Sequence, residues 1–212
     1  MPGAYDVGPF ARPYRRSVIS GDLVGEQGQH TVRLGIADHL GWAVAVTASA
    51  DHVVVDRRRI ELVEPGLSPA PIHYEGWKLD VAATVELVAT VRASVVRATS
   101  AALDELTAAV SVPVASISLR AWPPDFPDDI TVQRRPPYEA RVDAIMYRQV
   151  LSELARGRDW AVHLYDAKVV EAQALRALGE RGESVLWGPR ATLGPPWNKD
   201  HRVALAATVV AG

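Results

Sequence analysis

The sequence contains no cysteine, and several other features that would narrow its function are missing. Without thiols the chain cannot form disulfides, thiolate zinc sites or a cysteine nucleophile. No apolar run reaches the roughly 18 residues that a membrane-spanning helix needs. The N-terminal stretch MPGAYDVGPFARPYRRSV lacks the hydrophobic segment of a signal peptide. We therefore expect a cytoplasmic protein that does not contact a membrane.

A strong charge of one sign and the common catalytic motifs are also missing. The net charge is −2, so no global basic field indicates a nucleic-acid partner, although this leaves a local basic patch open. There is no GxSxG nucleophile elbow, no GxGxxG after a strand and no P-loop. His39 beside Asp38, and His73 with Glu75, are candidate ligands of a transition metal. Neither pair has the i, i+4 helical spacing of a zinc motif.

The composition that remains is that of an ordinary globular domain. The chain has 212 residues, of which 48% are hydrophobic and 23% charged, enough for one core. Residues 1–29 are rich in glycine, proline and arginine without a clear period, which predicts a flexible N-terminal arm before a single domain over residues 30–212. The arm holds arginines and aromatic residues that could contact a polyanion: Arg12, Arg15, Arg16, Tyr5, Phe10 and Tyr14.

Hydrophobic periodicity predicts five strands and four helices. The expected strands are residues 30–37, 41–48, 52–63, 114–122 and 160–166, and the expected helices are residues 77–109, 138–158, 167–182 and 198–211. Short connections make the first three strands antiparallel neighbours. The third strand carries charges in its middle, which indicates a sheet edge. Residues 123–137 and 187–197 are expected to be irregular loops because of their prolines.

This order of elements predicts an α/β fold with a five-stranded mixed sheet, three antiparallel strands followed by alternating helices and strands, and helices on both faces. The order, together with the stretch LGIADHLGWAVAV, resembles the ribonuclease H-like superfamily, in particular the RuvC-type Holliday junction resolvases. These enzymes place an aspartate on the first strand, before a glycine-containing turn and a second apolar strand. Asp38 takes that position, but Ala37 separates it from the Gly35-Ile36 pair that the aspartate usually follows directly.

The last helix carries a second point of resemblance. RuvC-type enzymes have acidic residues, sometimes with a histidine, at the start of a small, alanine-rich final helix, and KDHRVALAATVVA places Asp200 and His201 there. The fourth strand of the family normally ends with a glutamate that bridges two metals. Here that strand reads SISLRAW, and the nearest acids are Asp125, Asp128 and Asp129 in the following loop.

The resemblance implies a metal-dependent nuclease acting on structured or branched DNA. Its catalytic residues would be Asp38, Asp200 and His201. Asp38, Asp200 and Asp125 would be the ligands of Mg²⁺ or Mn²⁺, since hydrolysis with two ions needs several converging carboxylates. Substrate contacts are expected from basic and aromatic residues near the loops: Arg120, Trp122, Arg134, Arg135 and Arg190.

Two other readings of the sequence stay open. Without the fourth-strand glutamate, the domain could be a catalytically inactive ribonuclease H-like module for nucleic-acid binding or assembly. A small-molecule enzyme that holds an anion with Arg134, Arg135 and Arg190 is a weaker alternative. Because RuvC-type enzymes act as dimers, we expect a homodimer, with the helix of residues 77–109 as its contact surface.

Overall fold

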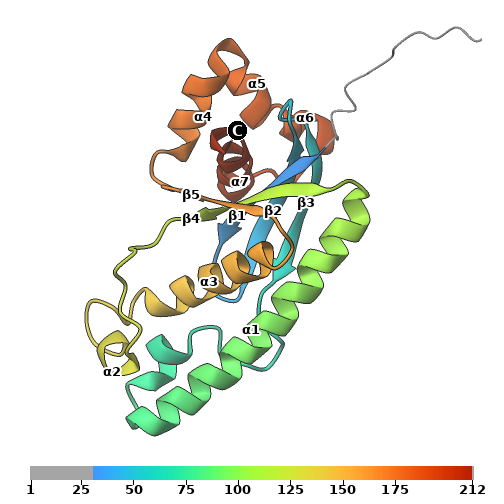
Figure 1. Cartoon of the computed structure of the whole chain (residues 1–212). Coiled ribbons are helices and arrows are strands. Elements are labelled where there is room, and N and C mark those ends of the chain that lie inside the picture. The colour runs from blue at the N-terminus through green and yellow to red at the C-terminus, as the bar shows by residue number, and fades with distance from the viewer. Residues whose placement is uncertain (1–30, 212) are drawn as a thin grey trace, which may run out of the picture.

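The computed structural model describes residues 31–211, and the predicted N-terminal arm lies outside this range. Its centre is a five-stranded sheet in the order β3-β2-β1-β4-β5 (Figure 1). The strands are β1 (Val32–Asp38), β2 (Trp42–Ser49), β3 (Val54–Glu61), β4 (Val114–Arg120) and β5 (Ala161–Tyr165).

Short turns set the antiparallel half of the sheet, and helices set its parallel half. β2 pairs antiparallel with both β1 and β3. Gly41 makes the tight β1–β2 turn possible because its φ of 82° is strained for other residues. β4 runs parallel to β1, and β5 runs parallel to β4. The predicted mixed sheet, and the edge position of β3, are confirmed.

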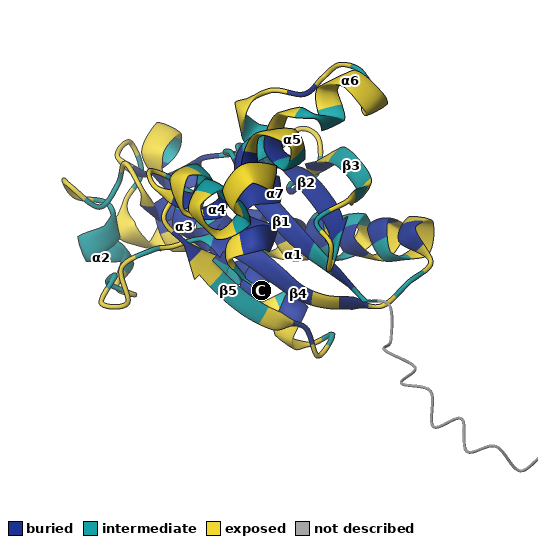
Figure 2. Ribbon diagram, turned by 90° about the horizontal axis from the view of Figure 1, so that it is seen from above, coloured by how far each residue is buried: buried dark blue, intermediate teal, exposed yellow. Residues whose placement is uncertain are grey.

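One face of the sheet is covered by α1 (Val81–Val110) and α3 (Val142–Arg156) (Figures 1 and 2). Alternate residues of β1, namely Val32, Leu34 and Ile36, pack into this core with buried residues of both helices. Asp80 caps α1 by accepting a hydrogen bond from Ala83 N at 2.8 Å, so the helix begins where a capping residue satisfies its free N–H groups.

The opposite face is covered by α4 (Val170–Leu178), α5 (Gly182–Trp187) and α7 (Lys199–Val210). The alanines of α7 let it lie directly on the strands. A Cβ on Gly35 would sit 1.9 Å from the Ala204 carbonyl oxygen, so β1 and α7 touch backbone to backbone at this point. Helices on both faces complete the predicted α/β layers.

Two segments that the sequence predicts to be irregular loops contain short helices. Residues 123–137 contain a short helix, α2 (Ile130–Gln133), whose N-cap is Asp129. Residues 187–197 contain another, α6 (Pro189–Leu193). The prolines flank or begin these helices, where no N–H donor is lost, so the proline content of a segment does not exclude a short helix. A single π-helical turn, η1 (Pro71–Gly76), precedes α1, and the 3₁₀ turn η2 (Gly179–Arg181) separates α4 from α5.

Within residues 31–211, no helix combines the length and the apolar character that crossing a membrane requires. The cytoplasmic location stays a prediction, as does the division into a flexible arm and one domain.

Candidate functional site

The carboxyl ends of β1, β4 and β5 lie together at one end of the sheet, where they present Asp38, Arg120 and Tyr165. Side chains alternate between the two faces of a strand. Asp38 therefore follows Leu34 and Ile36 onto the face that α1 and α3 cover. Its side chain is only 2% exposed, so the carboxylate needs a partner inside the protein.

That partner is Arg148, from the middle of α3. Its Nε donates a hydrogen bond to Asp38 Oδ2 at 2.8 Å, and its own side chain is 11% exposed. Arg120 adds a second guanidinium: its Nε lies 3.8 Å from Asp38 Oδ1, within ion-pair range but too far for a hydrogen bond. One carboxylate thus faces two guanidinium groups, which leaves a surplus positive charge.

Tyr165, at the end of β5, also belongs to this cluster. Its hydroxyl donates to the Ile36 carbonyl oxygen at 2.6 Å, and the residue is buried. Burial, and then the nearby Asp38 carboxylate, raise the pKa of the Tyr165 phenol well above its ordinary value of 10.0. The phenol therefore stays protonated and acts as a donor that holds β1 against β5.

Asp200 lies at the start of α7, which covers the other face of the sheet. Its Oδ2 is 3.2 Å from His39 Nε2, and both side chains are partly exposed. The His39 ring stacks on Trp42, with centroids 4.0 Å apart and planes at 10°. The guanidinium of Arg59 lies over the Trp42 ring, 4.1 Å from its centroid. Asp200 is therefore engaged with the β1–β2 turn.

His201 is buried at the first turn of α7 and belongs to its cap. The Asn198 amide oxygen accepts hydrogen bonds from Asp200 N at 3.0 Å and His201 N at 3.3 Å, so Asn198 is the N-cap of α7. His201 Nδ1 lies 2.7 Å from the same oxygen and accepts a hydrogen bond from Asn198 N at 3.4 Å, which completes a capping box. Burial, and then the Arg57 guanidinium, lower the pKa of His201 below 6.5.

Magnesium or manganese, which the resemblance implies, does not fit these side chains. A two-ion centre needs several oxygen ligands that converge and carry negative charge. Among residues 31–211, no three acidic or histidine side chains form a group that could hold a metal. Asp38 faces two arginines, and Asp200 contacts His39. The expected roles of Asp38, Asp200, His201 and Asp125 in metal binding and catalysis stay predictions without support from the contacts of the described residues.

The remaining predicted site residues are spread over the loops around the sheet. Trp122 packs partly buried against the α1–α3 core, and Asp125 is exposed in the turn that follows. Arg190 is exposed on α6, the short helix between α5 and α7. Arg134 and Arg135 follow α2, beside the start of α1. Of the predicted substrate-contact residues, all of which lie in the described part of the chain, only Arg120 forms an ion pair with Asp38.

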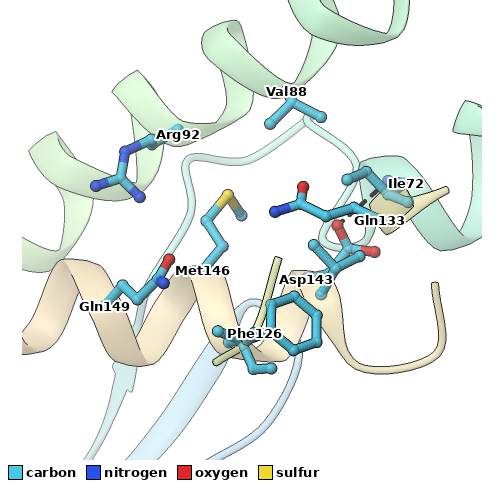
Figure 3. A pocket seen from close by; sticks show the side chains of 10 residues that line it. Ile72, Val88, Arg92, Phe126, Gln133, Asp143, Met146 and Gln149 are labelled. Carbon is cyan, nitrogen blue, oxygen red and sulfur yellow. Dashed lines mark hydrogen bonds between the residues drawn. The ribbon is translucent and has the colours of Figure 1, made fainter. Parts of the chain in front are cut away.

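A small cavity of about 110 Å³ lies between α1 and α3, under the α2 segment (Figure 3). Asp143 lines it but offers no free carboxylate, because its oxygens accept hydrogen bonds from Ile72 N at 3.2 Å and His73 N at 2.9 Å. These bonds fix η1 against α3. Burial raises the pKa of Asp143 above its ordinary value. The cavity is close to the volume of a few water molecules and is much smaller than a typical ligand pocket.

Sequence reasoning missed Arg148, the residue that decides the chemistry at Asp38. A signal was present. Arg148 lies three residues after Ile145 and three before Leu151, and both belong to the apolar stripe of α3. A charge at that spacing points into the core, where it requires a carboxylate partner.

Comparisons with known proteins show no family for this chain. No family model matches the sequence, and no curated protein matches it. Among solved structures, the chain is similar to T. thermophilus RuvC in complex with Holliday junction substrate, with 15% sequence identity and a TM-score of 0.44, over 85% of this chain and 92% of that chain. The strand order, the strand directions and the helices on both faces define a ribonuclease H-like α/β fold.

Proposed function

We propose that this protein is a ribonuclease H-like module that binds nucleic acid without cleaving it. The observation that carries the proposal is the buried contact between Arg148 Nε and Asp38 Oδ2, at 2.8 Å. A metal ion at Asp38 would have to displace this guanidinium from a carboxylate that is 2% exposed. It would also sit next to Arg120, where like charges repel.

The same surplus of positive charge favours an anionic ligand. The Arg120 side chain is 37% exposed, so it can reach a phosphate while its Nε stays near Asp38. Guanidinium groups bind phosphate oxygens in a forked geometry, and phosphate contacts supply most of the affinity of sequence-independent nucleic-acid binding. Arg120 is therefore the residue we assign to phosphate contact at this end of the sheet.

A cleavage assay tests the non-catalytic part of the proposal. Branched and linear DNA are incubated with the protein in Mg²⁺ and in Mn²⁺, with the Asp38→Asn variant alongside. We expect no metal-dependent products from either protein. We also expect Asp38→Asn to be less stable than wild type, because it leaves Arg148 as a buried charge without its carboxylate. Metal-dependent products from wild type that Asp38→Asn abolishes would restore the nuclease function.

A binding assay in EDTA tests the nucleic-acid part. Fluorescence anisotropy with labelled DNA should show binding that weakens with salt, and Arg120→Gln should lower both the affinity and the slope of log K against log salt by the equivalent of about one phosphate contact. Arg176→Gln, on the exposed face of α4, is the matched control and should change neither quantity. Wild-type protein that binds no nucleic acid at low salt would refute the proposal.

A further inference from the structure

An open groove lies between the start of α1 and the α2 segment. It has a volume of about 400 Å³ and is lined by Trp77, Val81, Thr131, Arg134 and Arg135. The Trp77 residue is 68% exposed, the highest exposure among the large hydrophobic residues in the described part of the chain. The exposed Trp77 indole lacks the stabilisation that burial of its apolar surface would give. A ligand that covers the indole would supply that burial, which is why we consider this groove a binding surface.

Three cationic side chains lie at or beside this groove, namely Lys78, Arg134 and Arg135. The Lys78 ammonium lies 5.0 Å from the Trp77 ring centroid. Arg134 Nη2 donates a hydrogen bond to the Leu79 carbonyl oxygen, which fixes that guanidinium beside the beginning of α1. Arg135 is exposed. Across residues 31–211 the ion pairs involve none of these three side chains.

The acidic residues next to the groove are occupied with helix capping. Asp80 accepts from Ala83 N at 2.8 Å at the start of α1. Asp129 accepts from Thr131 N and from the Thr131 hydroxyl, each at 2.7 Å. Both carboxylates are held at the helix ends, and neither forms an ion pair with Arg134 or Arg135 in the described residues. The bonds to Thr131, and then the nearby Arg135 charge, lower the pKa of Asp129, so an external anion would compete with that carboxylate for Arg135.

We propose that this groove binds an unpaired nucleobase together with its phosphate. The base would stack on the Trp77 indole, and the phosphate would meet Arg134 and Arg135. Stacking needs an open base face, which a duplex does not offer, so the ligand is a single strand or a free nucleotide. This inference deepens the proposed function and rests on it for the ligand class. It adds a site between the start of α1 and the α2 segment, where the base would stack on Trp77.

The test measures anisotropy of a labelled oligothymidylate in EDTA, and calorimetry with AMP, for the full chain and two variants. Trp77→Ala should weaken binding at least fivefold, since stacking on an aromatic side chain contributes about 1–3 kcal/mol per base. Arg135→Gln should make the salt slope shallower by about 0.7, the value for one contact to a single strand. Fluorescence from the other five tryptophans does not interfere with either readout.

Matched controls separate this groove from general effects. Trp187→Ala removes another exposed indole, which lies beneath Arg202 on a different part of the surface, and Arg156→Gln removes an exposed arginine of α3. Neither should change affinity. A Trp77-dependent interaction with the oligonucleotide alone identifies a single-strand site, and one with AMP as well identifies a nucleotide site. Both support the inference.

Equal affinity of wild type and Trp77→Ala for the oligonucleotide and for AMP would overturn the inference. If duplex DNA still binds through Arg120 in that case, the proposed function stands without the groove. If wild type binds none of the three ligands, both fail. Because Trp77 is exposed, Trp77→Ala is expected to fold, and its circular dichroism and melting temperature confirm that any loss of binding is local.

Discussion

Asp38 and Arg148 form an ion pair whose side chains are almost entirely shielded from water. The free energy of such a pair is asymmetric. Desolvation of both charges offsets most of their attraction, whereas removal of one partner leaves the other as a buried charge. The pair therefore specifies which side chains meet at the end of β1, and contributes much less to net stability than its 2.8 Å hydrogen bond suggests.

A double-mutant cycle tests this description of the pair. Arg148→Met should lower the free energy of unfolding by about 3 kcal/mol, because Arg120 is too distant to hydrogen-bond the orphaned carboxylate. Asp38→Leu combined with Arg148→Met should recover most of that loss, since two apolar side chains then replace two charges. Urea unfolding of the four proteins gives the coupling free energy. Losses that simply add would show that the two side chains do not interact.

The histidine at the start of α7 gives the protein a predictable pH dependence. Because the folded-state pKa of His201 is lowered from 6.5, the unfolded chain takes up its proton first as pH falls. The unfolded state then binds more protons, so stability decreases below about pH 6.5, by at most about 1.4 kcal/mol per pH unit for this residue.

His201→Gln should reduce that pH dependence without abolishing it, because His52 also has a lowered pKa, caused first by burial and then by Arg33. Thermal unfolding of both proteins measures the difference. The measurements run from about pH 5 to about pH 7.5, a range that spans the ordinary histidine pKa. A variant with the same pH profile as wild type would show that His201 protonates equally in both states.

At the level of elements, the contact between β1 and α7 positions the start of the final helix. Gly35→Ala places a Cβ against the backbone of Ala204 and should cost about 3 kcal/mol or more, because neither backbone can move without disturbing the sheet. Gly157→Ala is the matched control: its Cβ would meet no atom closer than 3.6 Å, so its effect should stay within about 0.5 kcal/mol. Chemical denaturation of both variants gives the comparison.

Arg57 shows how an edge strand can hold a distant loop. From β3 its guanidinium donates to the carbonyl oxygens of Leu193 at 2.7 Å and Gly194 at 2.9 Å, and also to that of Pro196. It lies 5.9 Å from the Trp197 ring centroid. The arginine run of β3 could be taken for a solvated edge from its sequence, yet its first member fixes the segment that leads into α7.

For the whole molecule, the homodimer expected from the resemblance stays a prediction. Its proposed surface is the exposed side of α1, where Val96 is 36% exposed. If α1 forms a two-fold contact, Val96→Glu should shift the mass measured by light scattering from dimer toward monomer, since the charge would appear twice across the interface. Val169→Glu, at an exposed position before α4, serves as the control. A monomer at all concentrations would contradict the expected dimer.

The sequence by itself determined the succession of elements, the pairing of the first three strands and the edge position of β3. These follow from local patterns: alternation in strands, a three- to four-residue period in helices, and turns that fit only a few residues. Short helices such as α2 and α6 were missed because their few residues carry no period. The alternation along β1 also places Asp38 on the side of Leu34 and Ile36.

Only the tertiary structure decided what Asp38 meets. Ala37 sits where the aspartate of the RuvC-type pattern would be, and it packs on the α7 face. A one-residue shift along a strand reverses the side-chain direction, so Asp38 turns away from α7 and Asp200 and toward Arg148 on α3. Which helix covers which face depends on packing between segments 110 residues apart. Local sequence patterns do not encode packing between segments so far apart in the chain. This packing determines whether the Asp38 carboxylate faces a metal ion or a guanidinium.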